Sequence, residues 1–331
     1  MKKKAIALIS GGLDSLLAAK VVKEQGVEVL GVAFVMSAVS TDVKTAAGQI
    51  REAAEDARIP VRVIDVSEKF LSVLRTPEYG YGSNINPCID CKIFMLREAK
   101  GIMEREGASF VITGEVLGER PMSQNRNSLD LIKKMSFLGE RLLRPLSAKS
   151  MKETIPEKEG VVDREKLLDI KGRSRKPQLA LAEKFAIHKF SAPGASCLLT
   201  DPEFAGRVKD LMNKNRLTAD NVDLLKYGRH FRLDEETKAV VGRDERDNTG
   251  IMALKKEDDV MLRLKGLPGP YVLLRGRPGP GNIAKAAALV VSHSKFREKK
   301  KIPVEFWKAR NDKKIIETGP ITREEIGSLR V

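Results

Sequence analysis

The feature that most constrains this chain is a short apolar run that breaks into a glycine-containing turn at Ser10–Ser15. Residues 5–9 are all apolar, which is typical of a buried parallel strand. Helical spacing of apolar residues begins at Leu13, so Ser-Gly-Gly lies between a strand and the start of a helix. Glycines let the backbone approach a ligand closely, and the first N–H groups of a helix favour phosphate. This stretch therefore predicts a phosphate-binding turn.

The side chains of the turn strengthen this prediction. Ser10 and Ser15 supply hydroxyl donors, and we expect Asp14 to hold a Mg²⁺ ion carried by the phosphates. The order Ser-Gly-Gly-Leu-Asp-Ser is not the G-x-x-x-x-G-K-[ST] loop of ordinary nucleotide hydrolases. It resembles the pyrophosphate loop of the ATP pyrophosphatase superfamily, which splits ATP between its α and β phosphates and adenylates a substrate. The resemblance implies ATP contacts along the loop, at Ser10, Gly11, Gly12, Leu13, Asp14 and Ser15.

The pattern after the turn predicts the fold class. Apolar stretches expected as strands alternate with stretches of helical spacing, which indicates an α/β fold with a doubly wound parallel sheet. Ligands of such sheets bind at the carboxyl ends of the strands, where the glycine turn lies. The expected strands are 5–9, 27–35, 61–66 and 109–113, and the expected helices include 46–57, 91–106 and 178–185. We expect residues 70–84 to form a polar loop and residues 151–173 to be mostly helical.

The composition limits the partners and the compartment. The 331 residues are enough for two or three domains, and 60 Lys and Arg against 45 Asp and Glu give a formal charge of +15. Such an excess attracts polyanions, so together with an ATP site it favours nucleic acid as the partner. No apolar run has the length of a transmembrane helix, and we expect a cytoplasmic protein with no membrane partner.

Three cysteines, too few for a disulfide framework, point to metal or redox chemistry. Cys88 and Cys91 form a C-x-x-C pair, and Cys91 is expected near a helix start beside Lys92, where a thiol pKa is lowered. Cys197 ends a loop of small residues and is expected to be accessible. The residues leave three interpretations open. The thiols could hold a [4Fe–4S] cluster with one open iron, carry a persulfide that a second thiol resolves, or only cap a helix.

A closer resemblance appears further along the chain. The segment T-G-E-V-L-G-E-R-P-M-S-Q at 113–124, followed by L-R-P-L-S-A-K at 143–149, resembles the catalytic domain of the tRNA 4-thiouridine synthases. The match departs at 119–122, where that family has Gln followed by small residues. The resemblance implies that Gly114, Glu115 and Gln124 contact the nucleotide, and that Lys149 stabilises the charge developing on the phosphates. The basic loop 172–177 is expected to be either a phosphate contact or a solvated turn.

The two resemblances together imply an ATP-dependent tRNA sulfurtransferase. A uridine carbonyl, at position 8 by resemblance, would be adenylated, and sulfur held by Cys88, Cys91 and Cys197 would replace the oxygen to give 4-thiouridine. The three-cysteine form is the cluster form in related thiouridine synthases, which favours [4Fe–4S]. The alternatives are a 2-thiouridylase or other RNA-base thiolase, or a non-catalytic RNA-binding factor with a vestigial ATP site. Sulfide or a separate donor protein would supply the sulfur, and the oligomeric state is left open.

The C-terminal part has a different pattern. From His230 onward, short segments of period 2 are bounded by Gly and Pro, which predicts a separate, smaller α+β domain. This part resembles the RNA-binding NFACT-R domain, and its basic runs, 275–277 and 297–301, fit contacts with an RNA backbone. We therefore expect a PP-loop thiolation domain over 1–200, a helical connector over 201–226 and an RNA-binding domain over 227–331.

Overall fold

The computed structural model describes residues 3–40, 42–191, 197–309 and 311–331. The chain divides into two compact units, Met1–Asp201 and Pro202–Val331. The helices within 201–226, expected as a connector, lie in the second unit. Each unit is described by itself below.

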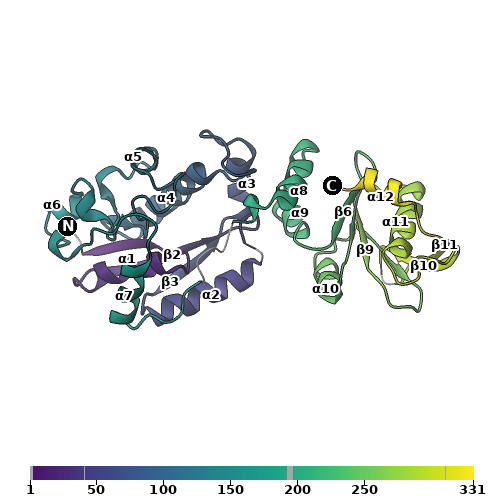
Figure 1. The fold of residues 1–331 in the computed structure, drawn as a ribbon, viewed down its shortest axis with the longest axis horizontal. Coiled ribbons are helices and arrows are strands. Elements are labelled where there is room, and N and C mark those ends of the chain that lie inside the picture. Colours follow the sequence, from purple (N-terminus) through teal and green to yellow (C-terminus); the bar gives the residue numbers. More distant parts are fainter. Residues whose placement is uncertain (1–2, 41, 192–196, 310) are drawn as a thin grey trace. The chain divides into compact units, whose positions relative to one another are not determined.

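The first unit is built on a five-stranded parallel sheet with the strand order β3-β2-β1-β4-β5 (Figure 1). β1 lies at the centre and pairs with β2 on one side and with β4 on the other. The prediction of a doubly wound α/β fold is therefore confirmed. The strands are β1 (Lys4–Leu8), β2 (Glu28–Val35), β3 (Val61–Asp65), β4 (Phe110–Ile112) and β5 (Leu142–Leu143).

Helices cover both faces of this sheet, because β1 alternates its side chains between two apolar cores. Ala5 and Ala7 pack with residues of α1, α2 and α7, whereas Ile6 packs with residues of α4. Figure 1 shows these two helical layers on opposite faces of the sheet. The helices are α1 (Leu13–Lys23), α2 (Val43–Asp56), α3 (Ser67–Arg75), α4 (Cys88–Arg105), α5 (Arg126–Met135), α6 (Ile155–Lys158) and α7 (Lys176–Lys184).

Two local predictions for this unit were wrong. The expected loop 70–84 begins inside α3, which forms because Phe70, Leu71 and Leu74 share one buried helical face. The stretch 151–173, expected to be mostly helical, contains only α6 and one turn of 3₁₀ helix, Arg164–Lys166. Gly160, with φ of +65°, ends the first of these helices. Charge and propensity favour a helix there, but the segment lacks a continuous apolar face.

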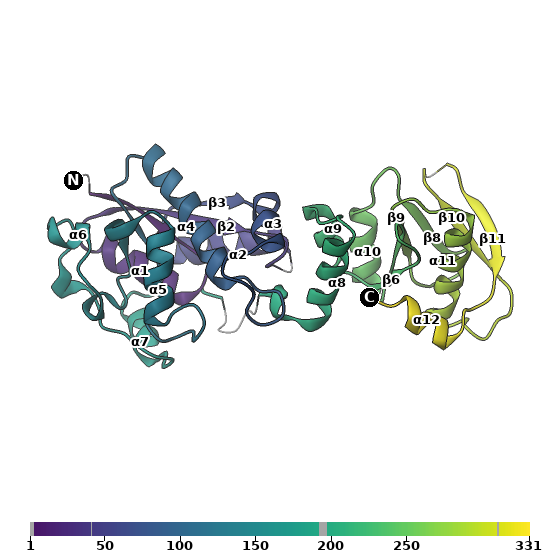
Figure 2. The same ribbon diagram turned by 90° about the horizontal axis from the view of Figure 1, so that it is seen from above.

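The second unit contains a six-stranded antiparallel sheet with the order β11-β10-β8-β9-β7-β6. The apolar side of α11 packs on one face of it, and Leu224 and Ile251 belong to the core of the other face (Figure 2). The prediction of a smaller α+β domain is confirmed. Its elements are α8 (Pro202–Asn213), α9 (Ala219–Leu224), β6 (Arg229–Arg232), β7 (Lys238–Val241), α10 (Glu245–Ala253), β8 (Val260–Leu264), β9 (Val272–Arg275), α11 (Pro280–Ser292), β10 (Ile302–Trp307), β11 (Lys314–Thr318) and α12 (Arg323–Leu329).

In the described part of the chain, no helix is both long enough and apolar enough to cross a membrane.

Candidate active site

The glycine turn, Ser10–Ser15, joins β1 to α1. Gly11 has φ of +78°, a conformation that favours glycine. The Ser15 hydroxyl donates to the carbonyl oxygen of Gly12 at 2.7 Å, and the backbone N–H of Ser10 donates to the Ser15 hydroxyl at 3.2 Å. Gly12, the N-cap of α1, brings no side chain to cap the helix. The first N–H groups of α1 are thus left for a ligand such as phosphate.

Gly114 brings a second loop against this turn. A Cβ atom on Gly114 would lie 2.5 Å from the carbonyl carbon and oxygen of Asp14 and 2.5 Å from the backbone nitrogen of Ser15. Only glycine permits so close an approach. Gly114 follows β4, and the sheet order reverses between β1 and β4. The two loops therefore meet at the switch point of the sheet, where ligands of doubly wound folds bind.

Several buried polar atoms in this region have no hydrogen-bond partner among the described residues. They are Arg175 Nε, Gln178 Oε1 and Gln124 Oε1. The Gln178 side chain lies near Asp14, where its hydrogen bonding lowers the Asp14 pKa. Arg175 and Gln178 belong to the start of α7, which packs against α1. Buried polar groups in folded proteins are almost always paired. Their concentration beside the glycine turn indicates a place that a polar ligand completes.

Two carboxyl groups and two guanidinium groups set the charge at this place. Burial raises the pKa of Asp14, and the charges of Arg175 and Arg120 oppose that rise. Burial also raises the pKa of Glu119, and the negative charge of Asp14 raises it further. Two neighbouring carboxylates are suitable ligands for Mg²⁺. The flanking guanidinium groups are suited to phosphate oxygens.

Glu115 is held in a buried charge network. Its carboxylate accepts from the Lys92 ammonium at 2.5 Å and from Arg144 Nε at 2.8 Å. Burial alone would raise its pKa, but Lys92 and Arg144 outweigh burial and hold the pKa at about 2. Both carboxylate oxygens are used by this network, so the Glu115 side chain positions Lys92 and Arg144 directly.

The three cysteines lie in one neighbourhood but are not arranged as ligands. Cys88 and Cys91 lie in the first turn of α4, and all three thiols are free and partly buried. Burial, and then the proximity of Cys197 and Cys88, raises the pKa of Cys91 to about 12. The expectation of a lowered pKa for Cys91 was wrong, because burial outweighs the Lys92 charge, which is already paired with Glu115. Within the described ranges, no three His, Cys, Asp or Glu side chains are grouped closely enough to hold a metal ion.

Two further predicted site residues are Cys197 and Lys149. Burial raises the pKa of Cys197 to about 11, and the expected loop before it (residues 192–196) lies outside the described residues. Lys149 lies on the 3₁₀ turn Ala148–Ser150, and its ammonium donates to the carbonyl of Glu165 at 2.9 Å and to its carboxylate at 3.1 Å. Among the described residues, the Lys149 ammonium contacts Glu165 and does not contact the glycine turn.

Comparison with protein families assigns both parts of the chain. Residues 1–159 match the family described as thiamine biosynthesis protein (ThiI), and residues 228–330 match the NFACT protein RNA binding domain. The chain joins a ThiI-like PP-loop domain to an NFACT RNA-binding domain. The match to the ThiI family includes the glycine turn, the loop at Gly114 and the C-x-x-C pair of α4. The match to the ThiI family stops before α7, so Arg175 and Gln178 lie beyond it.

Curated relatives cover part of the ThiI-like PP-loop domain. The chain is 35% identical over 130 residues to the tRNA-specific 2-thiouridylase MnmA of Clostridium botulinum (strain Eklund 17B / Type B), covering 34% of this chain and 35% of the relative. It is 37% identical over 110 residues to MnmA 1 of Syntrophus aciditrophicus (strain SB), covering 29% and 28%. The chain thus spans about a third of the length of these relatives. A solved 4-thiouridine synthetase–RNA complex with bound ATP aligns with a TM-score of 0.36 and 22% identity, covering 56% of this chain and 51% of that one.

Three site residues of the ThiI-like domain were not predicted from the sequence. Arg175 lies in the basic loop 172–177, which was expected to be either a phosphate contact or a solvated turn. Its position beside Asp14 favours the phosphate contact. Gln178 carried no signal, because a glutamine at a helix start is ordinary. Glu119 was seen only as a departure from the family pattern. Its position near Asp14 makes it part of the site.

Proposed function

We propose that this chain is an ATP-dependent tRNA sulfurtransferase that adenylates a uridine carbonyl oxygen and replaces it with sulfur, forming 4-thiouridine at position 8. The observation that carries the proposal is the group of buried polar side chains of Asp14, Arg175 and Gln178 beside the glycine turn, in which Arg175 Nε has no hydrogen-bond partner among the described residues. This group fits the triphosphate and the Mg²⁺ that adenylation needs. The match of residues 1–159 to the ThiI family supports the reaction class.

The proposed roles follow from the chemistry of each group. The N–H groups at the start of α1, with Ser10 and Ser15, bind the pyrophosphate. Asp14 and Glu119 would hold a Mg²⁺ ion, and the ion would supply positive charge opposite the phosphates. Arg175 stabilises the negative charge that develops as the uridine oxygen attacks the α-phosphate. Gly114 keeps the second loop close to the turn, and Gln124 and Leu13 complete the nucleotide contacts.

The remaining predicted contacts are proposed to act less directly. Glu115 positions Lys92, whose ammonium it holds at 2.5 Å. Lys149 is held by Glu165 on a half-exposed surface, so its proposed role on the phosphates requires it to leave that partner. The recorded contacts therefore support Arg175 more strongly than Lys149 as the cation of the adenylation step.

For sulfur transfer we propose Cys88, Cys91 and Cys197. In addition to burial, the charges of Cys197 and Cys88 raise the pKa of Cys91, and the charge of Cys88 raises the pKa of Cys197, which supports a shared role for these thiols. Three thiolates match in number a [4Fe–4S] cluster with one open iron. The thiols as positioned do not form a ligand group, so we derive no step through a cluster. Iron analysis of anaerobically purified protein separates the two schemes. Near-stoichiometric iron supports the cluster. Full activity of iron-free protein, supplied with a donor protein that already carries a persulfide, together with sulfane sulfur trapped on this chain, supports the persulfide.

The match to the NFACT RNA binding domain supports tRNA as the substrate. We further propose sulfide or a separate protein as the sulfur donor and the cytoplasm as the location. A second candidate product is 2-thiouridine, favoured by the 35% identity to the 2-thiouridylase of Clostridium botulinum. A non-catalytic RNA-binding role has no specific support, because the whole Ser10–Ser15 turn and its polar surroundings are present.

The experiment is thiolation of unmodified tRNA by the purified, anaerobically reconstituted chain with ATP, Mg²⁺ and sulfide. Nucleosides are then identified by mass spectrometry, which separates 4-thiouridine from 2-thiouridine. Asp14→Asn should abolish thiolation, whereas Asp130→Asn, which removes an exposed carboxylate on α5, should leave it unchanged. If the chain forms no thiolated nucleoside and releases no pyrophosphate while an authentic thiolase works in the same assay, the proposal is wrong.

A further inference from the structure

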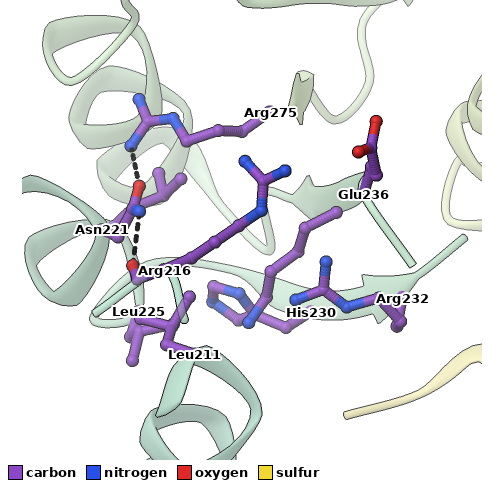
Figure 3. A pocket seen from close by; sticks show the side chains of 10 residues that line it. Leu211, Arg216, Asn221, Leu225, His230, Arg232, Glu236 and Arg275 are labelled. Atoms are coloured by element: carbon purple, nitrogen blue, oxygen red, sulfur yellow. Dashed lines mark hydrogen bonds between the residues drawn. The ribbon is translucent and has the colours of Figure 1, made fainter. Parts of the chain in front are cut away.

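The second unit contains a small basic cavity of about 30 Å³, above the ~10–15 Å³ that one water molecule needs. It lies among α8, α9 and the strands β6, β7 and β9. Figure 3 shows Arg216 extending across it and the Arg232 guanidinium directed toward His230. The charged and polar residues that line it are Arg216, Asn221, His230, Arg232, Glu236, Lys238 and Arg275.

Most of the cations at this cavity are held by carboxylates behind them. Asp210 accepts from Arg232 Nη2 at 2.5 Å and from the Lys238 ammonium at 2.9 Å. Asp259 accepts from Arg275 Nη2 at 2.7 Å, and Asn221 Oδ1 accepts from Arg275 Nη1 at 3.1 Å. These contacts fix the positions of three cations. They leave donors of Lys238 and Arg232 unused, since each group carries more N–H bonds than its contacts consume.

Arg216 differs from these three cations. In the described ranges of the chain, no ion pair or hydrogen bond is recorded for its guanidinium, which is partly buried. The one acidic lining residue, Glu236, is exposed and has Arg277 as its own neighbour at 3.8 Å. The cavity is therefore lined by the Arg216 guanidinium, which has no counter-charge among the described residues, and by three other cations whose positions are fixed by their partners. Such an arrangement attracts an anion that accepts several hydrogen bonds.

His230 supplies a second, independent observation. The side chain is 1% exposed, and its Nε2 lies 2.8 Å from the carbonyl oxygen of Tyr227. A carbonyl only accepts, so Nε2 carries the hydrogen and Nδ1 is an acceptor, which has no partner among the described residues. Burial, and then Lys238, lowers the pKa of His230, so the ring is neutral at pH 7. Nδ1 is therefore an unused acceptor on a ring that lines the cavity.

We propose that this cavity binds a backbone phosphate of RNA, with Arg216 as the principal contact and Arg232 and Lys238 as further donors. A water molecule between His230 Nδ1 and the phosphate donates one hydrogen to each, which satisfies the unpaired nitrogen. The proposal deepens the tRNA binding proposed above and rests on it. It adds a specific phosphate site, away from the basic runs 275–277 and 297–301 except at Arg275. Asp259, Asn221 and the Leu254 carbonyl accept from four of the five N–H donors of Arg275.

The first test compares tRNA binding by the full chain and two single-charge variants. Arg216→Ala should weaken binding about tenfold at low salt. It should also reduce the slope of log affinity against log salt by about one contact. Arg246→Ala removes the same charge from an exposed position on α10 outside the cavity, and it should change affinity less than twofold. Unchanged affinity and slope in Arg216→Ala, or equal losses in both variants, would overturn the proposal.

The second test does not depend on tRNA binding. The chain has three histidines, so the ring signals of selectively labelled histidine can be assigned by substitution and followed by NMR. Titration with inorganic phosphate should shift the His230 ring signal in the wild-type chain and in Arg246→Ala, and not in Arg216→Ala. No shift in the wild type overturns the site. A shift without any effect of Arg216→Ala on tRNA binding means that the cavity takes free phosphate, which overturns the RNA assignment. Failure of the wild type to bind tRNA contradicts the proposed function instead.

Discussion

The buried carboxylate of Glu115 is expected to contribute strongly to the stability of the first unit. Glu115→Gln keeps the shape of the side chain but removes its charge. The change leaves Lys92 and Arg144 without their counter-charge, and the Arg144 side chain is only 4% exposed. Breaking a buried ion pair by removing one partner typically costs about 3–5 kcal/mol.

The pKa of Glu115 gives a second route to the magnitude. The carboxyl group has a pKa of about 2 in the folded chain against 4.5 without the fold. At about 1.4 kcal/mol per pH unit, this difference corresponds to about 3 kcal/mol. Because the folded pKa is the lower one, the stabilisation is fully present above pH 4.5. It is lost as the pH falls from 4.5 toward 2. Both routes predict that Glu115→Gln lowers the free energy of unfolding at pH 7 by about 3 kcal/mol.

Urea denaturation measured with two probes checks this prediction. The single tryptophan, Trp307, lies in the second unit, so its fluorescence follows that unit, whereas far-UV circular dichroism follows both. Glu115→Gln should move the circular dichroism transition of the first unit and leave the fluorescence transition in place. Glu106→Gln, which removes a surface carboxylate paired with Lys4 and Arg62, should have a much smaller effect. A change below 1 kcal/mol in Glu115→Gln, or a difference from wild type that does not shrink between pH 4.5 and 2, would refute the reasoning.

Three further variants test the close approaches and the proposed cation. Gly114→Ala places a Cβ 2.5 Å from the Asp14 backbone, so ATP binding measured by calorimetry should weaken at least tenfold; an affinity within twofold of wild type would contradict the close contact. Gly276→Ala, at φ of +120° and with its Cβ 1.9 Å from the Glu236 carbonyl oxygen, should lower the urea midpoint seen by tryptophan fluorescence; an unchanged midpoint would be inconsistent with it. Arg175→Ala should weaken ATP binding about tenfold relative to the exposed Arg173→Ala, and equal affinities would argue against Arg175 as a phosphate contact.

The parallel sheet could be predicted because its signal is local. The run 5–9 is apolar along its length, as a strand buried on both faces is. The segments 27–35 and 61–66 are mostly apolar, with Glu28, Arg62 and Asp65 as polar interruptions, and each of the three lies within one or two residues of the observed strand. The strands β10 and β11 in the second unit were not predicted. Lys314–Thr318 is an edge strand with exposed side chains, so its sequence carries no apolar alternation. Its pairing with β10 decides its structure.

The candidate site could be predicted only where its residues are close in sequence. Ser10–Ser15 and Gly114 follow strands, and the rule for parallel sheets places both at the carboxyl edge. Arg175 and Gln178 reach Asp14 from α7, about 160 positions along the chain. No local pattern encodes that contact, because it depends on how α7 packs against α1. The same limit explains why the pKa of Cys91 was predicted wrongly. Its neighbours on the chain favour a low pKa, but burial in the folded chain raises the pKa to about 12.

The contacts of Glu115 connect the glycine turn to the cysteines. Gly114 touches the backbone of Asp14, the adjacent Glu115 holds the Lys92 ammonium, and Lys92 follows Cys91 in α4. Lys92 lowers the pKa of Cys91, yet its ion pair with Glu115 directs much of its charge to the carboxylate. A ligand that moved the loop at Gly114 would therefore act on both members of this ion pair. The electrostatic environment of the Cys91 thiol is thus tied to the position of the loop that contacts the proposed ATP site.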